Sequence, residues 1–153
     1  MKLSSILKLL AERIYNCSYD VIDTSGNMPN PTFQKILVET GIADLLIECI
    51  YHLYDPMVFI ESNRGPCADK SYRNKIEEIF QCSYKLIEKI AANNQDNRIY
   101  LSRWVELIVE QSNCINQSYI QFCILGILQN NPISIEFTIN EKTIIDLVGK
   151  FFD

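Results

Sequence analysis

The sequence predicts an all-α fold, an armadillo-like α-solenoid of about seven helices. Apolar residues recur at three- and four-residue spacing along most of the 153-residue chain. Only five glycines and five prolines are present, too few for the many turns of a β-sandwich or barrel. Gly41 separates two periodic segments and predicts the sharp helix corner of armadillo-type repeats. Periodicity alone does not separate a solenoid from a helix bundle, so the bundle stays open as the alternative.

The predicted helices are separated by stretches rich in Pro, Asn, Asp and Gly. They cover residues 2–19, 32–39, 42–54, 72–94, 97–111, 116–128 and 140–152. The first has Leu3, Ile6 and Leu10 on one face, with charged residues opposite. The second has Thr32 as its expected N-cap, and Gly41 separates it from the third.

The fourth helix has the most regular pattern, because Ile76, Phe80 and Ile87 recur on one face. The fifth carries the apolar positions around Trp104. In the sixth, residues 119–128 are apolar nearly all round, which predicts a helix buried between neighbours. The seventh has Asn140 as its expected N-cap. Turn residues predict a loop over 23–31 and a long loop over 55–71. Residues 133–139 alternate weakly, which leaves an extended connector and a short helix both open.

Composition and charge exclude several classes of protein. The net charge of −5 and the pI near 4.9 do not favour nucleic-acid binding, which usually needs a basic surface. No apolar run reaches the ~18 residues of a membrane span, so we expect a soluble segment without direct membrane contact. The six cysteines form no CxxC pair and no secretory signal is present, which indicates reduced cysteines in a cytosolic protein. The length suits one domain over residues 1–153.

No catalytic residue, metal ligand set or cofactor is expected. The single histidine, His52, lies three residues after Cys49, a spacing that a nucleophile and its base could share. Cys49 falls on the apolar face of its helix, however, which favours packing over catalysis. There is no second histidine or CxxC pair for zinc, and no phosphate-binding glycine loop. The pattern does not indicate an enzyme.

Four segments in a fixed order carry a family resemblance. They are ILKLLAERIY, FQKILVETGIADLLIECI, IFQCSYKLIEKIAANNQDNRIYLSRWVELI and YIQFCILGILQNNPISIEFTINEKTIIDLVGKF. Together they resemble the RIH domain, the homology domain shared by ryanodine receptors and inositol trisphosphate receptors. The likeness covers residues 6–151 and is closer to the inositol trisphosphate receptors.

This resemblance implies an armadillo-like segment of a much larger homotetrameric calcium-release channel, on the cytosolic face of the endoplasmic reticulum membrane. In the inositol trisphosphate receptors the domain forms one wall of the ligand cleft, and a β-trefoil forms the other. The implied role is regulatory: to relay ligand binding through contacts with neighbouring domains, a β-trefoil among them. The alternative is a stand-alone helical scaffold that binds a protein or peptide partner, with a likeness generic to armadillo-like chains.

The family's basic ligand residues carry over only in part. Lys35 matches the central lysine of the family's RxxxKxxR helix, but Pro31 and Val38 stand at its two arginine positions. Arg98 matches, within one or two residues, the arginine of a later cluster. Each missing charge-assisted contact is worth about 1.5–3 kcal/mol, and ~1.4 kcal/mol is a factor of ten in affinity. We therefore expect inositol trisphosphate binding to be weakened or lost.

Overall fold

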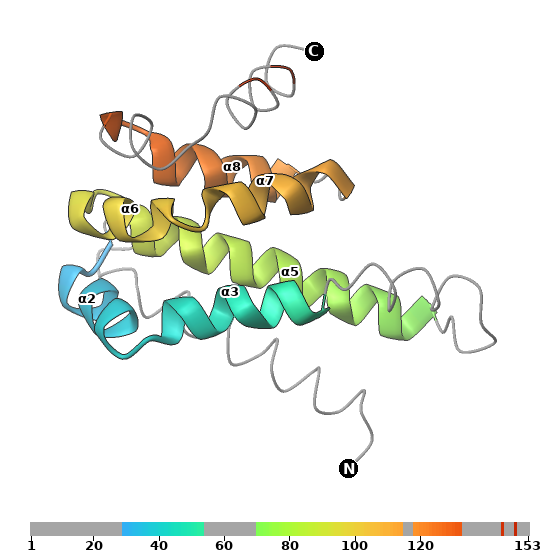
Figure 1. Cartoon of the computed structure of the whole chain (residues 1–153). Coiled ribbons are helices and arrows are strands. Elements are labelled where there is room, and N and C mark those ends of the chain that lie inside the picture. The colour runs from blue at the N-terminus through green and yellow to red at the C-terminus, as the bar shows by residue number, and fades with distance from the viewer. Residues whose placement is uncertain (1–28, 54–69, 115–117, 133–144, 146–148, 150–153) are drawn as a thin grey trace.

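The computed structural model describes residues 29–53, 70–114, 118–132, 145 and 149. These residues form no β-strand, and their helices are α2 (Pro31–Glu39), α3 (Ile42–Leu53), α5 (Lys70–Ala91), α6 (Gln95–Ser102), α7 (Val105–Cys114) and α8 (Ser118–Leu128) (Figure 1). The all-α prediction is confirmed. Five predicted segments lie wholly or almost wholly outside the described residues: 2–19, 23–31, 55–71, 133–139 and 140–152.

The helices form two similar units of three. In each unit a short helix turns sharply into a second helix, and a third follows: α2, α3 and α5, then α6, α7 and α8. In Figure 1, α3 and α7 run in one direction and α5 and α8 in the opposite one. Stacked units of this kind make an α-solenoid, so the solenoid prediction is confirmed over the described residues.

The first unit begins at a capped proline and turns at a glycine. The side-chain oxygen of Asn30 accepts hydrogen bonds from the backbone N–H groups of Thr32 and Phe33, at 3.1 and 3.2 Å. Pro31 takes the first helical position, which its fixed φ favours. The expected cap, Thr32, is therefore wrong by two residues. Gly41 has a φ of +73°, which a glycine adopts without strain, and the predicted corner between α2 and α3 is confirmed.

The predicted helix over 97–111 is wrong in one respect: it is two helices that meet at Arg103 and Trp104. The Ser102 hydroxyl donates to the carbonyl of Ile99 at 2.7 Å, and the Trp104 N–H donates to Leu101 only three residues back. Both bonds tighten the chain at the corner. The pattern concealed the break because apolar residues on both sides of it are buried.

The core lies mainly between α5 and α8, the helix pair with the most extensive contact. Gly126 allows their close approach, because a Cβ atom there would lie 3.2 Å from Cγ of Glu88. As predicted, α8 lies among neighbours, in contact with α5, α6 and α7. One side of it stays open, however, since Phe122 and Leu125 are 59% and 46% exposed. The two helices contribute to the core isoleucines that are at most 1% exposed: Ile79, Ile87, Ile90, Ile120, Ile124 and Ile127.

Replacing Ile124 by Ala should lower the free energy of unfolding by about 2–5 kcal/mol, because a cavity would form between α5 and α8. Its neighbour Leu125 is a matched control: Leu125→Ala should cost less than about 1 kcal/mol. Urea unfolding followed by circular dichroism measures both values. Equal costs for the two variants would contradict this packing.

Candidate interaction surface

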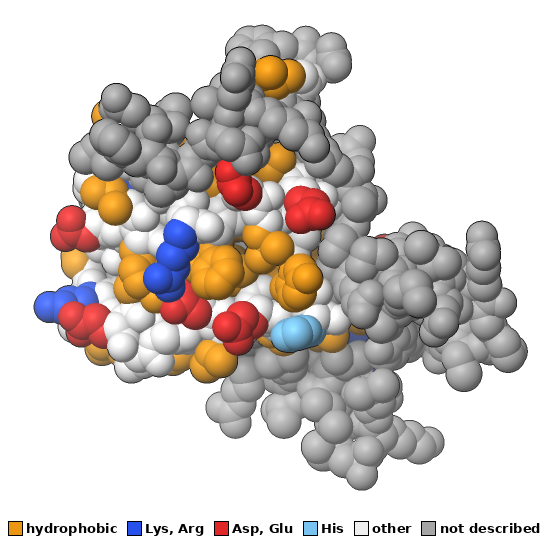
Figure 2. Space-filling model, in the orientation of Figure 1, with side chains coloured by type: hydrophobic (Ala, Val, Ile, Leu, Met, Phe, Trp, Pro, Cys, Tyr) orange, Lys and Arg blue, Asp and Glu red, His pale blue; other side chains and the backbone are white. Residues whose placement is uncertain are grey.

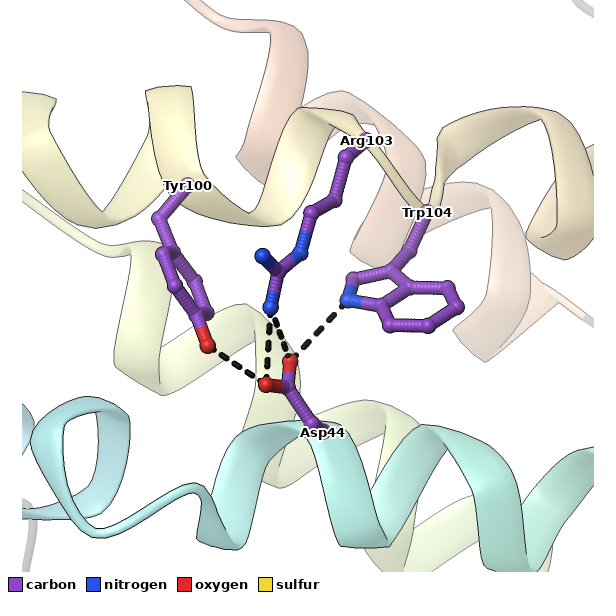
Figure 3. A network of polar contacts seen from close by, with 4 residues as sticks. All are labelled: Asp44, Tyr100, Arg103 and Trp104. Atoms are coloured by element: carbon purple, nitrogen blue, oxygen red, sulfur yellow. Dashed lines mark hydrogen bonds and ion pairs between the residues drawn. The ribbon is translucent and has the colours of Figure 1, made fainter.

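A carboxylate on the first unit joins it to the corner of the second. The side chain of Asp44, in the first turn of α3, accepts four hydrogen bonds from the α6–α7 corner (Figure 3). The Tyr100 hydroxyl donates at 2.5 Å, and Nε1 of Trp104 donates at 3.1 Å. Nη2 of Arg103 donates to both carboxylate oxygens, at 2.6 and 2.7 Å. We call these four side chains the Asp44 joint.

The surroundings of Asp44 favour its charged form. Burial raises the pKa of the carboxyl, but the hydrogen bonds from Arg103, Tyr100 and Trp104 outweigh burial and hold that pKa below its ordinary value. The hydrogen bond to Asp44 likewise raises the pKa of Arg103. The guanidinium also lies over the Tyr100 ring, 3.9 Å from its centroid. The joint therefore holds the guanidinium between an aromatic ring and a carboxylate.

Arg98 ties the second unit to the ends of two long helices. It is only 9% exposed. Its Nε donates to the carbonyl of Ala91 at 3.1 Å, and its Nη1 donates to that of Gln129 at 2.9 Å. Beyond these carbonyls, Asn93 and Asn130 both adopt left-handed φ angles, of 54° and 53°. Arg98 therefore satisfies carbonyl groups at the C-terminal ends of α5 and α8.

Gln34 makes the matching connection from the first unit. It is 2% exposed, and its Nε2 donates to the carbonyls of Lys89 and Ala92, both at 2.8 Å. Its Oε1 accepts a hydrogen bond from Asn94 at 3.3 Å. A buried glutamine at this position thus attaches α2 to the end of α5. Sequence reasoning missed this role, because an isolated glutamine carries no pattern.

Lys35, the other predicted ligand residue, is exposed on α2 and lies 3.6 Å from Glu39 in an ion pair. It borders a pocket of about 440 Å³ between α2 and α6. The charged residues that line this pocket are Lys35, Glu39 and Asp96, so acids outnumber bases. Arg98 does not line it. The structure does not bring the two predicted residues together at one pocket, and two of the N–H groups of Arg98 already donate to backbone carbonyls.

A second hollow, the α3–α7 groove, has a volume of about 340 Å³. Its lining is formed by Ile47, Glu48, Tyr51, Trp104, Leu107 and Glu110. Figure 2 shows hydrophobic side chains in the middle of this face, with acidic side chains on both sides of them. The groove begins beside the Asp44 joint, because Trp104 belongs to both.

The Cys49 and His52 pair shows no feature of an activated nucleophile. Cys49 is half-buried, and burial raises the pKa of its thiol, which favours the unreactive protonated form. His52 is exposed, and its ring meets that of Tyr51 edge-on at 5.6 Å. Within the described ranges no three side chains of the metal-binding types come together, and no helix is long and apolar enough to cross a membrane.

Comparison with known proteins gives one match. The family model described as the RIH domain matches residues 2–150, nearly the whole chain. This match confirms the resemblance to that family, but it does not distinguish the two receptor types. No curated protein and no solved structure matches the chain.

Replacing Asp44 by Asn should lower the free energy of unfolding at pH 7 by about 1–3 kcal/mol, because an amide cannot accept all the bonds that the carboxylate accepts. The lowered pKa of Asp44 sets the pH dependence. Its contribution is complete above the unfolded-state pKa of about 3.9 and disappears as the pH falls through the lower folded-state value. The difference between wild type and variant should therefore shrink below about pH 4. Urea unfolding at several pH values measures it, with Glu48→Gln as the control. A difference that is constant with pH would rule out this charge dependence.

Arg98→Met should destabilise the domain by about 2–3 kcal/mol, because buried carbonyls lose a charged donor. Lys35→Met should change stability by less than about 0.5 kcal/mol, because it breaks only an exposed ion pair. Thermal or urea unfolding of both variants tests the contrast. If Arg98→Met is as stable as the wild type, the two hydrogen bonds of Arg98 do not hold the ends of α5 and α8.

Proposed function

The chain belongs to the RIH domain family, a domain of ryanodine receptor and inositol trisphosphate receptor channels, and we propose that it acts as a cytosolic regulatory domain of an inositol trisphosphate receptor-like calcium-release channel. In this proposal it relays binding events to other domains of the channel. The observation that carries the relay role is the Asp44 joint, which connects the two helical units through four hydrogen bonds.

A relay needs units that move together, so that a displacement at one end is transmitted to the other. Polar contacts connect the two units at several places, and two of them involve the first two helices, α2 and α3. The Asp44 joint connects α3 to the α6–α7 corner, and Gln34 with Asn94 connects α2 to the junction before α6. Between them, the packed isoleucines of α5 and α8 resist deformation. These contacts support a domain that responds as one body.

Binding of inositol trisphosphate by this domain does not depend on its relay role. The family's ligand residues persist only as Lys35 and Arg98, and the pocket beside Lys35 carries two acids and one base. Phosphate groups are bound by several cationic donors acting together. We therefore propose that this domain contributes little to inositol trisphosphate binding, and that its partners are neighbouring domains of a homotetrameric channel, including a β-trefoil, on the cytosolic side of the endoplasmic reticulum.

The second candidate function is that of a scaffold for a protein or peptide partner outside any channel. The α3–α7 groove favours it, because the groove is apolar in its middle and lies open on the surface. The two functions predict different behaviour of the full-length protein. Only the first requires calcium flux.

Calcium release tests the channel role. The full-length protein that carries this domain is expressed in cells without their own release channels, and calcium in the endoplasmic reticulum is followed with a luminal indicator. We expect release only at high concentrations of inositol trisphosphate, because this domain contributes little to binding it. The response should be altered for Asp44→Asn at equal protein amounts and unaltered for the exposed control Glu78→Gln. Absence of release with or without inositol trisphosphate would contradict the channel role. Release that is insensitive to inositol trisphosphate would contradict the assignment of receptor type.

Calorimetric titration of the 153-residue chain with inositol trisphosphate should show no saturable binding tighter than about 100 μM, which corresponds to ~5.5 kcal/mol. The reason is the charge of the pocket that Lys35 lines, where two acids face one base. Micromolar binding that Lys35→Met abolishes would show that this pocket still recognises the ligand.

A further inference from the structure

The α3–α7 groove has a shape that fits a short apolar ridge. Ile47 and Tyr51 lie one turn apart on α3. On the other side, Trp104 at the α6–α7 corner lies three residues before Leu107 on α7. From Trp104 to Glu110 the lining of α7 extends about 9 Å at 1.5 Å per residue. Ile47 is buried, whereas Tyr51 is 52% exposed. The groove therefore has room for one or two large apolar side chains along the direction of the helices.

The charged residues that line this groove are all acidic. Glu48 on α3 and Glu110 on α7 are both exposed, and no lysine or arginine lines the groove. In the part of the chain that the structure describes, neither carboxylate forms a hydrogen bond or an ion pair. Arg103, the basic residue at the groove's end, already donates to both carboxylate oxygens of Asp44. A cation brought by a partner would therefore meet free acids on both walls.

The Asp44 joint lies at one end of the groove and holds one of its lining residues, Trp104. α3 and α7 are not among the helix pairs in extensive contact, and the joint connects them at one end. Trp104 is fixed there by its hydrogen bond to Asp44 at 3.1 Å, so one wall is preorganised. Preorganisation lowers the entropy lost when a partner binds.

From these observations we infer that the α3–α7 groove binds an amphipathic helix whose apolar ridge of one or two large side chains is flanked by lysines or arginines. This inference names the kind of partner that the proposed regulatory domain binds, and it rests on that proposed function. Apolar side chains would fill the space between Tyr51, Trp104 and Leu107, and the flanking cations would pair with Glu48 and Glu110. Recognition of a helix by anchors at three- and four-residue spacing suits a groove of this form. A second copy of the chain is a poorer occupant, because it carries a net charge of −5.

The experiment uses the intrinsic fluorescence of Trp104, the single tryptophan of the chain, which lies in the groove. The 153-residue protein is titrated with a synthetic tryptophan-free helical peptide that has leucines on one face and lysines beside them. A matched peptide has glutamates in place of the lysines. We expect a saturable change in Trp104 emission with the basic peptide and none with the acidic one.

Two charge-matched double variants locate the binding. The double variant Glu48→Lys with Glu110→Lys should lower the affinity for the basic peptide at least ~10-fold, because both walls of the groove then repel its lysines. Glu39→Lys with Glu78→Lys changes the net charge equally but away from the groove, and should alter the affinity less than ~2-fold. Circular dichroism checks that each variant is folded. If the lysine double variant does not fold, Glu48→Gln with Glu110→Gln takes its place in the titration.

Three results would overturn the inference: no saturable change with the basic peptide, equal binding of the acidic peptide, or equal loss in both double variants. Emission that depends on protein concentration without peptide would assign the groove to a second copy instead. Peptide binding requires no channel. If the peptide titration fails, the proposed channel role is still tested by calcium release. If calcium release fails, the peptide result still supports the groove as a binding site.

Discussion

The Asp44 carboxylate is the constraint on which the arrangement of the two helical units depends. Its four hydrogen bonds come from the corner where α6 turns into α7, so the carboxylate fixes that corner against the start of α3. The negative charge also lies in the first turn of α3, where the helix dipole favours it. A neutral side chain of the same size would leave the guanidinium of Arg103 without its carboxylate partner.

The C-terminal ends of α5 and α8 are held by a second set of hydrogen bonds. Arg98 and Gln34 donate to carbonyls at the last turns of α5 and α8, where helices leave such groups unsatisfied. Both side chains are almost fully buried, so their hydrogen bonds are shielded from water. The family resemblance matches Arg98 to a ligand-binding arginine. In this chain its N–H groups donate to backbone carbonyls instead.

The helices were largely predictable from the sequence, and the contacts between them were not. Periodic apolar residues indicated α5 and α8, and Gly41 indicated the corner before α3, because these signals are local. The break at Arg103 was missed because Leu101 and Val105 keep the core face continuous across it. The Asp44 joint connects residues that are 56 to 60 positions apart, beyond the reach of any local pattern. One available signal was overlooked: an isoleucine followed three residues later by an Asn-Asn pair ends both α5 and α8 and marks the repeat.

Hydrogen exchange, measured amide by amide, tests most directly whether the Asp44 joint makes the two units one body. We expect the slowest amides of α3 and α8 to open with the same free energy and the same dependence on denaturant in the wild type, as in one cooperative unit. In Asp44→Asn, the α3 amides should open separately and at lower free energy than those of α8. If α3 already opens independently in the wild type, or if the variant leaves its opening unchanged, the joint does not couple the units and the relay account fails.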